Sequence, residues 1–123
     1  MNRWNIPLEV EQLVAARDRE CAYCQSSFSG SGGPYRSRAS WEHVVNDLAL
    51  VTAANIVLCC VGCNASKGAR PIELWLSSPY CRQRGIAAES VSPVVRTVLL
   101  ARLAAQPAAP NNSFKPKPLR GSA

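Results

Sequence analysis

The apolar residues near the start of the chain are spaced for an amphipathic helix over residues 6–17. Pro7 suits the first turn of such a helix, where its missing N–H is not needed. Residues three or four positions apart share one face of a helix, so the apolar positions form a single stripe. The stripe consists of Ile6, Val10, Leu13 and Val14. We therefore predict a helix that packs along this stripe.

Three later segments also carry helix signals. Residues 61–67 are followed by Gly68, and glycine commonly ends a helix. Residues 71–76 begin with a proline, which is favoured at a first helical position. Ser92 and Pro93 form a favourable N-cap and first-turn pair for a last helix. The apolar face of that last helix would be Val94, Val95, Val98, Leu99 and Leu103.

Two short segments between these helices, residues 40–45 and 55–59, are β-branched and apolar enough for strands. The connection between them, residues 46–54, is long for a hairpin turn and contains no glycine. Residues 25–40 are rich in serine and glycine, which predicts a loop or an irregular hairpin.

The apolar pattern ends at about residue 105. We therefore predict one domain over residues 1–105 and a disordered basic tail over residues 106–123. The tail holds four of the chain's nine prolines and three basic residues, Lys115, Lys117 and Arg120. A domain this small has a marginal hydrophobic core and often needs a metal or another cross-link.

The 123-residue chain has a formal net charge of +6, which favours a polyanionic partner. No stretch approaches the roughly 20 apolar residues that cross a bilayer. The start of the chain has no apolar run typical of a signal peptide. We therefore expect no membrane contact and a cytoplasmic location.

Two Cys-x-x-Cys pairs indicate a zinc site. Cys21 and Cys24 form the first pair, and Cys60 and Cys63 form the second. A two-residue gap lets one turn supply two thiolates, and two such turns complete a tetrahedral site. Adjacent strand residues face opposite ways, so only one of Cys59 and Cys60 can easily face the metal. The spacing to Cys63 favours Cys60 as the ligand, with Cys59 as a buried thiol. Four thiolates leave no open position, so this zinc would be structural.

His43 is the chain's single histidine, and it lies between the two cysteine pairs. It is therefore the one imidazole able to act as a base near neutral pH. Glu42 precedes it, and Asn64 follows the last paired cysteine. Carboxylate and amide oxygens are ligands for a hard divalent cation such as Mg²⁺. A lone histidine is more often a structural residue than a base. The interpretation of His43 as a base therefore depends on its neighbours Glu42 and Asn64.

These residues resemble the HNH endonuclease family. The resemblance covers residues 16–70, with residues 71–105 as C-terminal helices. It is carried by Arg17-Asp18, by Cys21-Ala-Tyr-Cys24, by Glu42-His43-Val44, by Asn55-Ile-Val-Leu and by Cys60-Val-Gly-Cys63-Asn64-Ala-Ser-Lys67-Gly68. It implies an α+β fold of the ββα-metal kind, with flanking helices and a four-cysteine structural zinc.

The resemblance also implies a role for each site residue. His43 would be the general base, and Asn55 would brace the following loop and orient His43. Glu42 and Asn64 would hold the catalytic Mg²⁺ or Mn²⁺. Two features depart from the family pattern: Glu42 replaces an aspartate, and residues 45–48 replace a segment with proline and glycine.

The implied function is metal-dependent hydrolysis of DNA by a stand-alone endonuclease. One alternative is a zinc-supported nucleic-acid-binding or adaptor module with weak or no hydrolysis. Another is a nuclease that is active only with a partner protein, and symmetric double-strand cutting would need a homodimer. Lys67, Arg36 and Arg38 are candidate nucleic-acid contacts, although each also suits an ordinary solvated surface.

Overall fold

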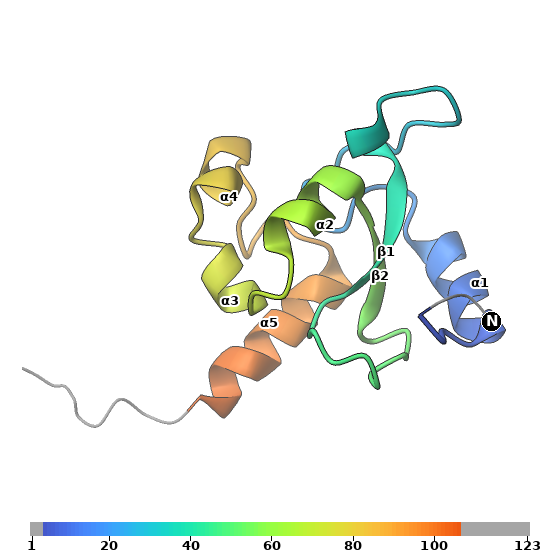
Figure 1. Cartoon of the computed structure of the whole chain (residues 1–123). Coiled ribbons are helices and arrows are strands. Elements are labelled where there is room, and N and C mark those ends of the chain that lie inside the picture. The colour runs from blue at the N-terminus through green and yellow to red at the C-terminus, as the bar shows by residue number, and fades with distance from the viewer. Residues whose placement is uncertain (1–3, 107–123) are drawn as a thin grey trace, which may run out of the picture.

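A computed structural model describes residues 4–106 of the chain. It is a small α+β structure in which helices lie on both sides of a two-stranded sheet (Figure 1). Apart from Gln106, the predicted basic tail lies outside the described residues. The elements in chain order are α1 (Leu8–Arg17), the 3₁₀ turn η1 (Tyr35–Ser37), β1 (Ala39–His43), β2 (Ile56–Cys60), α2 (Val61–Lys67), α3 (Ile72–Trp75), α4 (Pro79–Arg84) and α5 (Pro93–Ala105).

The two predicted strands are confirmed, and they pair antiparallel with His43 opposite Ile56. β1 ends at His43, two residues before the predicted end. The reason is the side chain of Asn55, whose Oδ1 accepts a hydrogen bond from the backbone N–H of Val45 at 2.8 Å. The backbone of residue 45 is therefore engaged by a side chain and leaves the strand pairing.

The sheet separates two apolar clusters, as strand alternation requires. Ile56 and Leu58 of β2 pack in the smaller cluster with Val14 of α1. Val57 and Cys59 face the larger cluster, which includes residues of α3, α4 and α5. Figure 1 shows α1 on one side of the strands and α2 to α5 on the other.

A charged pair fixes the end of α1 to β2. Arg17 binds both carboxylate oxygens of Asp18 and donates to the carbonyls of Ala53 and Ile56. The Asp18 Oδ2 accepts the N–H of Leu58 at 3.0 Å. These contacts occupy backbone groups on the outer edge of β2 that would otherwise be unpaired.

α1 differs from its prediction in two details. Pro7 is the N-cap of the helix and precedes its first turn. Leu13 is 61% exposed, so its predicted place on the buried stripe is wrong. Val14 is fully buried, and the buried stripe is narrower than the periodicity indicated because only one face of this helix meets the sheet.

The predicted helices after β2 are present. α2 continues directly from β2 and ends at Gly68, whose φ of 53° suits glycine. Ser92 caps α5 by accepting the N–H of Val95. Leu103, predicted on the buried face of α5, is 47% exposed, since this helix extends beyond the core at its end.

The sequence prediction omitted α4. Its N-cap is Ser78, followed by Pro79, which is the same signal that marked the start of α5. α4 has six residues, too short for an apolar stripe to be visible. Within residues 4–106, no helix has the length and apolar character needed to span a bilayer.

Candidate metal centre and neighbouring site residues

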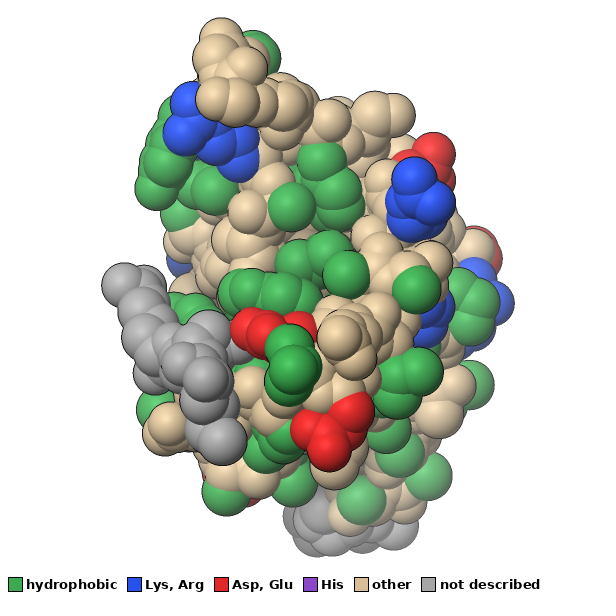
Figure 2. Space-filling model, turned by 90° about the vertical axis from the view of Figure 1, so that its right-hand side faces the viewer, with side chains coloured by type: hydrophobic (Ala, Val, Ile, Leu, Met, Phe, Trp, Pro, Cys, Tyr) green, Lys and Arg blue, Asp and Glu red, His purple; other side chains and the backbone are tan. Residues whose placement is uncertain are grey.

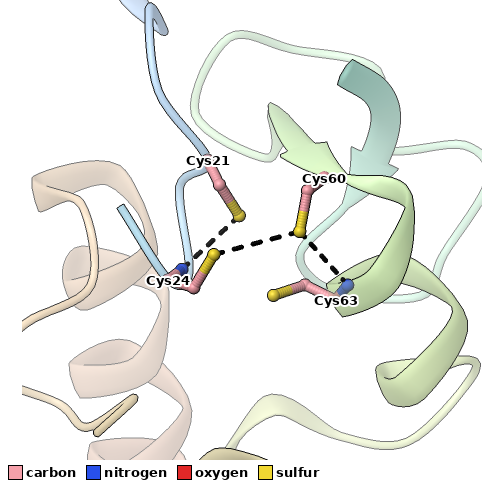
Figure 3. A group of neighbouring side chains, drawn as sticks. All are labelled: Cys21, Cys24, Cys60 and Cys63. Atoms are coloured by element: carbon pink, nitrogen blue, oxygen red, sulfur yellow. Dashed lines mark hydrogen bonds between the residues drawn. The ribbon is translucent and has the colours of Figure 1, made fainter. Parts of the chain in front are cut away.

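The four paired cysteines form one cluster, and their Sγ atoms all lie within 4.8 Å of one another. Figure 3 shows the two Cys-x-x-Cys turns bringing their side chains together. The Sγ atoms of Cys24 and Cys60 are 3.9 Å apart. Four sulfurs bound to one zinc at about 2.3 Å lie roughly 3.8 Å apart, so the spacing fits a tetrahedral ion. The cysteines are therefore positioned to bind a metal, consistent with structural zinc.

The turns themselves prepare the sulfurs for a cation. The N–H of Cys24 points at Cys21 Sγ, and the N–H of Cys63 points at Cys60 Sγ, each at 3.4 Å. An N–H aimed at sulfur stabilises the thiolate form, which is the form that binds zinc.

Mutual hydrogen bonds split the pKa values of the four thiols. The hydrogen bond with Cys21 is the main cause that lowers the pKa of Cys24. The hydrogen bond with Cys21 is also the main cause that lowers the pKa of Cys60, to about 6. The bond with Cys24 is the main cause that raises the pKa of Cys21, and the bond with Cys21 raises that of Cys63. Four thiols this close share protons when no cation is bound, whereas zinc takes all four as thiolates.

Elements distant in sequence support the cluster. Ala22 lies between the first two cysteines; its N–H donates to the Leu58 carbonyl, and its carbonyl accepts the N–H of Ser92. Tyr80 of α4 donates its hydroxyl to Cys63 Sγ at 3.4 Å. Sequence reasoning missed Tyr80, because no spacing rule relates it to the cysteines.

The two remaining cysteines are buried outside this cluster, which confirms the prediction of a buried thiol at Cys59. Cys59 is fully buried and faces Ser40, with 3.8 Å between Sγ and Oγ. Cys81 is fully buried in the larger cluster. Alternation along β2 thus directs Cys59 away from the four-sulfur cluster.

His43 ends β1 and is buried, with 6% of its surface exposed. Its Nε2 is the one buried side-chain nitrogen or oxygen without a hydrogen-bond partner among residues 4–106. The ring meets the indole of Trp4 edge-on, with 6.1 Å between centroids. Burial lowers the pKa of His43, and the Lys67 ammonium lowers it further, while Asp47 opposes them. The imidazole is therefore neutral at pH 7.

Glu42 points toward the larger cluster. Its Oε2 lies 2.9 Å from the Nζ of Lys67 and accepts the hydroxyl of Tyr23 at 2.8 Å. Burial raises the pKa of Glu42, and Lys67 opposes that shift. Lys67 is itself fully buried, and its Nζ also lies 3.5 Å from the His43 carbonyl. Because the Lys67 side chain is buried and paired with Glu42, a phosphate cannot reach it in this arrangement.

Asn64 of α2 is held against β1. Its Nδ2 donates to the carbonyl of Trp41 at 3.1 Å and to Ser40 Oγ at 3.0 Å. A carbonyl only accepts hydrogen bonds, and the Ser40 hydroxyl already donates its hydrogen to the Cys59 carbonyl. Both partners of Asn64 therefore need a donor, so the amide nitrogen faces them and not the amide oxygen. The amide is thereby oriented, and its Oδ1 makes no hydrogen bond within the described residues.

Asn55 holds the chain that follows His43. Besides accepting from Val45, its Nδ2 donates to the carbonyls of Val45 and Leu50, each at 3.1 Å. The side chain is 5% exposed, so these bonds are largely shielded from water. These hydrogen bonds hold residues 45–50, the segment that follows His43, against Asn55.

The arginine candidates are exposed and lie on η1 or next to it. The Arg38 guanidinium lies over the ring of Tyr35, 5.8 Å from its centroid. Arg36 lines a hollow of about 390 Å³ beside Cys24 and Cys60, together with Arg84. Figure 2 shows one face of the molecule, where basic side chains occur in separate groups without forming a continuous patch.

The structure brings some predicted residues together and leaves others apart. Glu42 of β1 contacts Lys67 of α2, and Asn64 of α2 contacts Ser40 of β1, whereas the ring of His43 contacts Trp4. No hydrogen bond or ion pair joins the side chains of Glu42 and His43 in the described ranges. Among residues 4–106, the four cysteines are the one group of three or more His, Cys, Asp or Glu side chains able to hold a metal.

Comparison with protein-family models, curated proteins and solved structures found no match to this chain.

Proposed function

We propose that this protein is a zinc-stabilised, metal-dependent endonuclease of the HNH type that hydrolyses DNA phosphodiester bonds with His43 as general base. The observation that carries the proposal is the buried, unpartnered Nε2 of His43 at the end of β1. A buried polar atom without a partner costs free energy, so its retention calls for an explanation outside the fold. A proton-accepting role supplies one.

His43 has the state that such a role requires. Its pKa is lowered by burial and then by Lys67, so the ring is neutral and able to accept a proton at pH 7. In the proposed reaction, Nε2 takes a proton from water as the water oxygen bonds to phosphorus. The bond from phosphorus to the leaving oxygen then breaks, and that oxygen keeps the electron pair and takes a proton from water. Asn55 keeps the chain after His43 in place through its three hydrogen bonds.

The residues available for a catalytic cation are Glu42 and Asn64. Mg²⁺ commonly binds through one or two protein oxygens and completes its shell with water and substrate phosphate. The Asn64 Oδ1 fits this role, because the Asn64 nitrogen is held by Ser40 and Trp41. Glu42 fits through its second oxygen, since Oε2 is engaged by Lys67 and Tyr23. When bound, the cation supplies stabilisation of negative charge on the phosphate.

The test is a plasmid-nicking assay with purified, zinc-loaded protein and a titration of Mg²⁺ or Mn²⁺. We expect nicking by the wild type that requires the added cation and stops when that cation is removed by dialysis, with the zinc retained. His43→Ala is expected to lower the rate at least about 100-fold, the scale of a general base. Asn64→Ala is expected to abolish nicking while one zinc per chain and a cooperative unfolding transition are retained. Wild-type nicking by His43→Ala at full zinc occupancy would rule the proposal out.

A second candidate is a zinc-supported nucleic-acid-binding or adaptor module without hydrolysis. The ion pair between Glu42 and Lys67 favours it, because it already satisfies one oxygen of the proposed cation ligand. Salt-sensitive DNA binding, with no nicking at any Mg²⁺ or Mn²⁺ concentration, would select this candidate. Nicking that appears only in cell extract would instead indicate dependence on a partner.

A further inference from the structure

A hollow of about 280 Å³ lies at the free edge of β1, beside the candidate site. Aromatic side chains from three parts of the chain line it: Trp4 of the N-terminal segment, Tyr35 of η1 and Trp41 of β1. Ser40 and Asn64 add polar groups to its wall. The hollow is therefore aromatic on several sides and able to form hydrogen bonds on another.

Core packing does not explain Tyr35. Its side chain is 67% exposed, in a segment otherwise rich in serine and glycine. The Arg38 guanidinium lies over its ring, which adds a positive charge at the rim of the hollow. An exposed aromatic ring with an arginine beside it is a common arrangement for stacking a nucleobase near its phosphate.

The hollow also lies next to two candidate functional residues, Asn64 and His43. Asn64, whose amide is oriented by Ser40 and Trp41, is part of its wall. Trp4, another wall residue, contacts the ring of His43. A base held in the hollow would therefore bring its own sugar-phosphate close to both candidate functional residues.

We propose that this hollow binds one unstacked nucleobase, so that the preferred substrate is a single-stranded or locally unpaired nucleic acid. Bases inside a duplex are stacked on both faces and cannot enter such a hollow without leaving the helix. Stacking on aromatic rings tolerates any base, so the site discriminates between nucleic acids by strand structure and not by sequence. The relevance to cleavage rests on the proposed function, but base binding itself needs no hydrolysis.

The test measures binding of fluorescently labelled oligothymidylate to the full, zinc-loaded chain without added Mg²⁺ or Mn²⁺. Three other ligands have the same length: an oligomer with abasic sites, a duplex and an oligouridylate. We expect the abasic oligomer and the duplex to bind about tenfold more weakly than oligothymidylate. The oligouridylate separates RNA from DNA as the source of the base.

Tyr35→Ala is the informative variant, because the exposed side chain can be removed without disturbing the core. We expect it to weaken oligothymidylate binding about tenfold and to leave duplex binding unchanged. Tyr35→Phe, which keeps the ring, should bind like the wild type. Trp4→Ala and Trp4→Phe form a second pair with the same expected contrast.

Equal binding of the abasic and base-bearing oligomers, or wild-type oligothymidylate binding by Tyr35→Ala, would overturn the inference. These outcomes are separable from failure of the proposed function. Normal plasmid nicking with base-independent binding would support the nuclease proposal and reject the nucleobase site. Base-dependent binding without nicking would support the nucleobase site and reject the nuclease proposal.

Discussion

The ammonium of Lys67 lies fully inside the protein, where a charge is stable only with a partner. Glu42 provides that partner, and Tyr23 donates to the same carboxylate oxygen. This small network lies directly behind the backbone of His43, since Lys67 Nζ also contacts the His43 carbonyl. At the residue scale, the candidate base is therefore placed by buried charges as well as by strand pairing.

Replacing Lys67 by methionine should destabilise the domain by about 3 kcal/mol, because Glu42 would remain buried without its cation. Burial raises the pKa of Glu42, and the positive charge of Lys67 lowers it. Loss of Lys67 removes this lowering. In the variant, the folded-state pKa of Glu42 then lies further above the unfolded value of 4.5. A raised folded pKa gives stability that is lost as pH rises, so the deficit should be larger at pH 8 than at pH 6.

Urea unfolding of zinc-saturated protein at the two pH values measures this effect. The double variant Glu42→Gln, Lys67→Met is the matched control and should recover part of the stability and lose the pH dependence. A Lys67→Met protein as stable as the wild type, with weaker DNA binding, would show instead that Lys67 acts as a nucleic-acid contact.

At the scale of elements, α3 and α5 are joined by an ion pair across 29 positions of sequence. Arg102 Nε lies 2.7 Å from Glu73 Oε1, and its second nitrogen lies 3.0 Å from Oε2. Arg102 lowers the pKa of Glu73, and Glu73 raises that of Arg102. The pair fixes the outer ends of two helices whose inner residues, Trp75 and Leu99, pack in the larger cluster.

A double-mutant cycle with Glu73→Gln and Arg102→Met should give a coupling energy of about 1 kcal/mol. The bidentate geometry favours the pair, while the partial exposure of Arg102 lets solvent screen it. Urea unfolding of the four proteins measures this value. A coupling within error of zero would mean that apolar packing alone positions α5.

At the scale of the whole molecule, the four-cysteine cluster connects segments that no single element spans. The first turn precedes both strands, the second joins β2 to α2, and Tyr80 reaches the cluster from α4. The Ala22 carbonyl accepts the N–H of Ser92, the N-cap residue of α5. Metal binding is therefore expected to organise both apolar clusters together, since binding and folding are coupled in such sites.

The adjacent pair Cys59 and Cys60 offers a direct test with the same chemical change at neighbouring positions. Cys60→Ser should lose zinc and unfold, as should the wild type treated with a strong chelator. Cys59→Ser should keep one zinc per chain and a cooperative unfolding transition, because Ser40 Oγ lies beside that position. Zinc content by elemental analysis and thermal unfolding measure both. Zinc retained in Cys60→Ser and lost in Cys59→Ser would reverse the ligand assignment.

Much of this architecture follows from local sequence rules. Paired cysteine spacing, the Gly68 stop and the Ser92-Pro93 start depend on interactions within a few residues, and the structure places each as expected. Alternation along β2 likewise separates Cys59 from Cys60 without reference to the rest of the chain. Such features are readable because their physical cause is local.

Other features depend on which surfaces meet. The exposure of Leu13 and Leu103, the burial of Lys67 against Glu42, and the contact of Trp4 with His43 all require the packed molecule. No spacing rule relates residues separated by 25 or more positions whose contact depends on how the helices close over the sheet. The sequence by itself determined the two cysteine pairs, the strands and the position of the single histidine. Only the tertiary structure decided which charges are buried and what surrounds that histidine, because burial and pairing are properties of surfaces brought together.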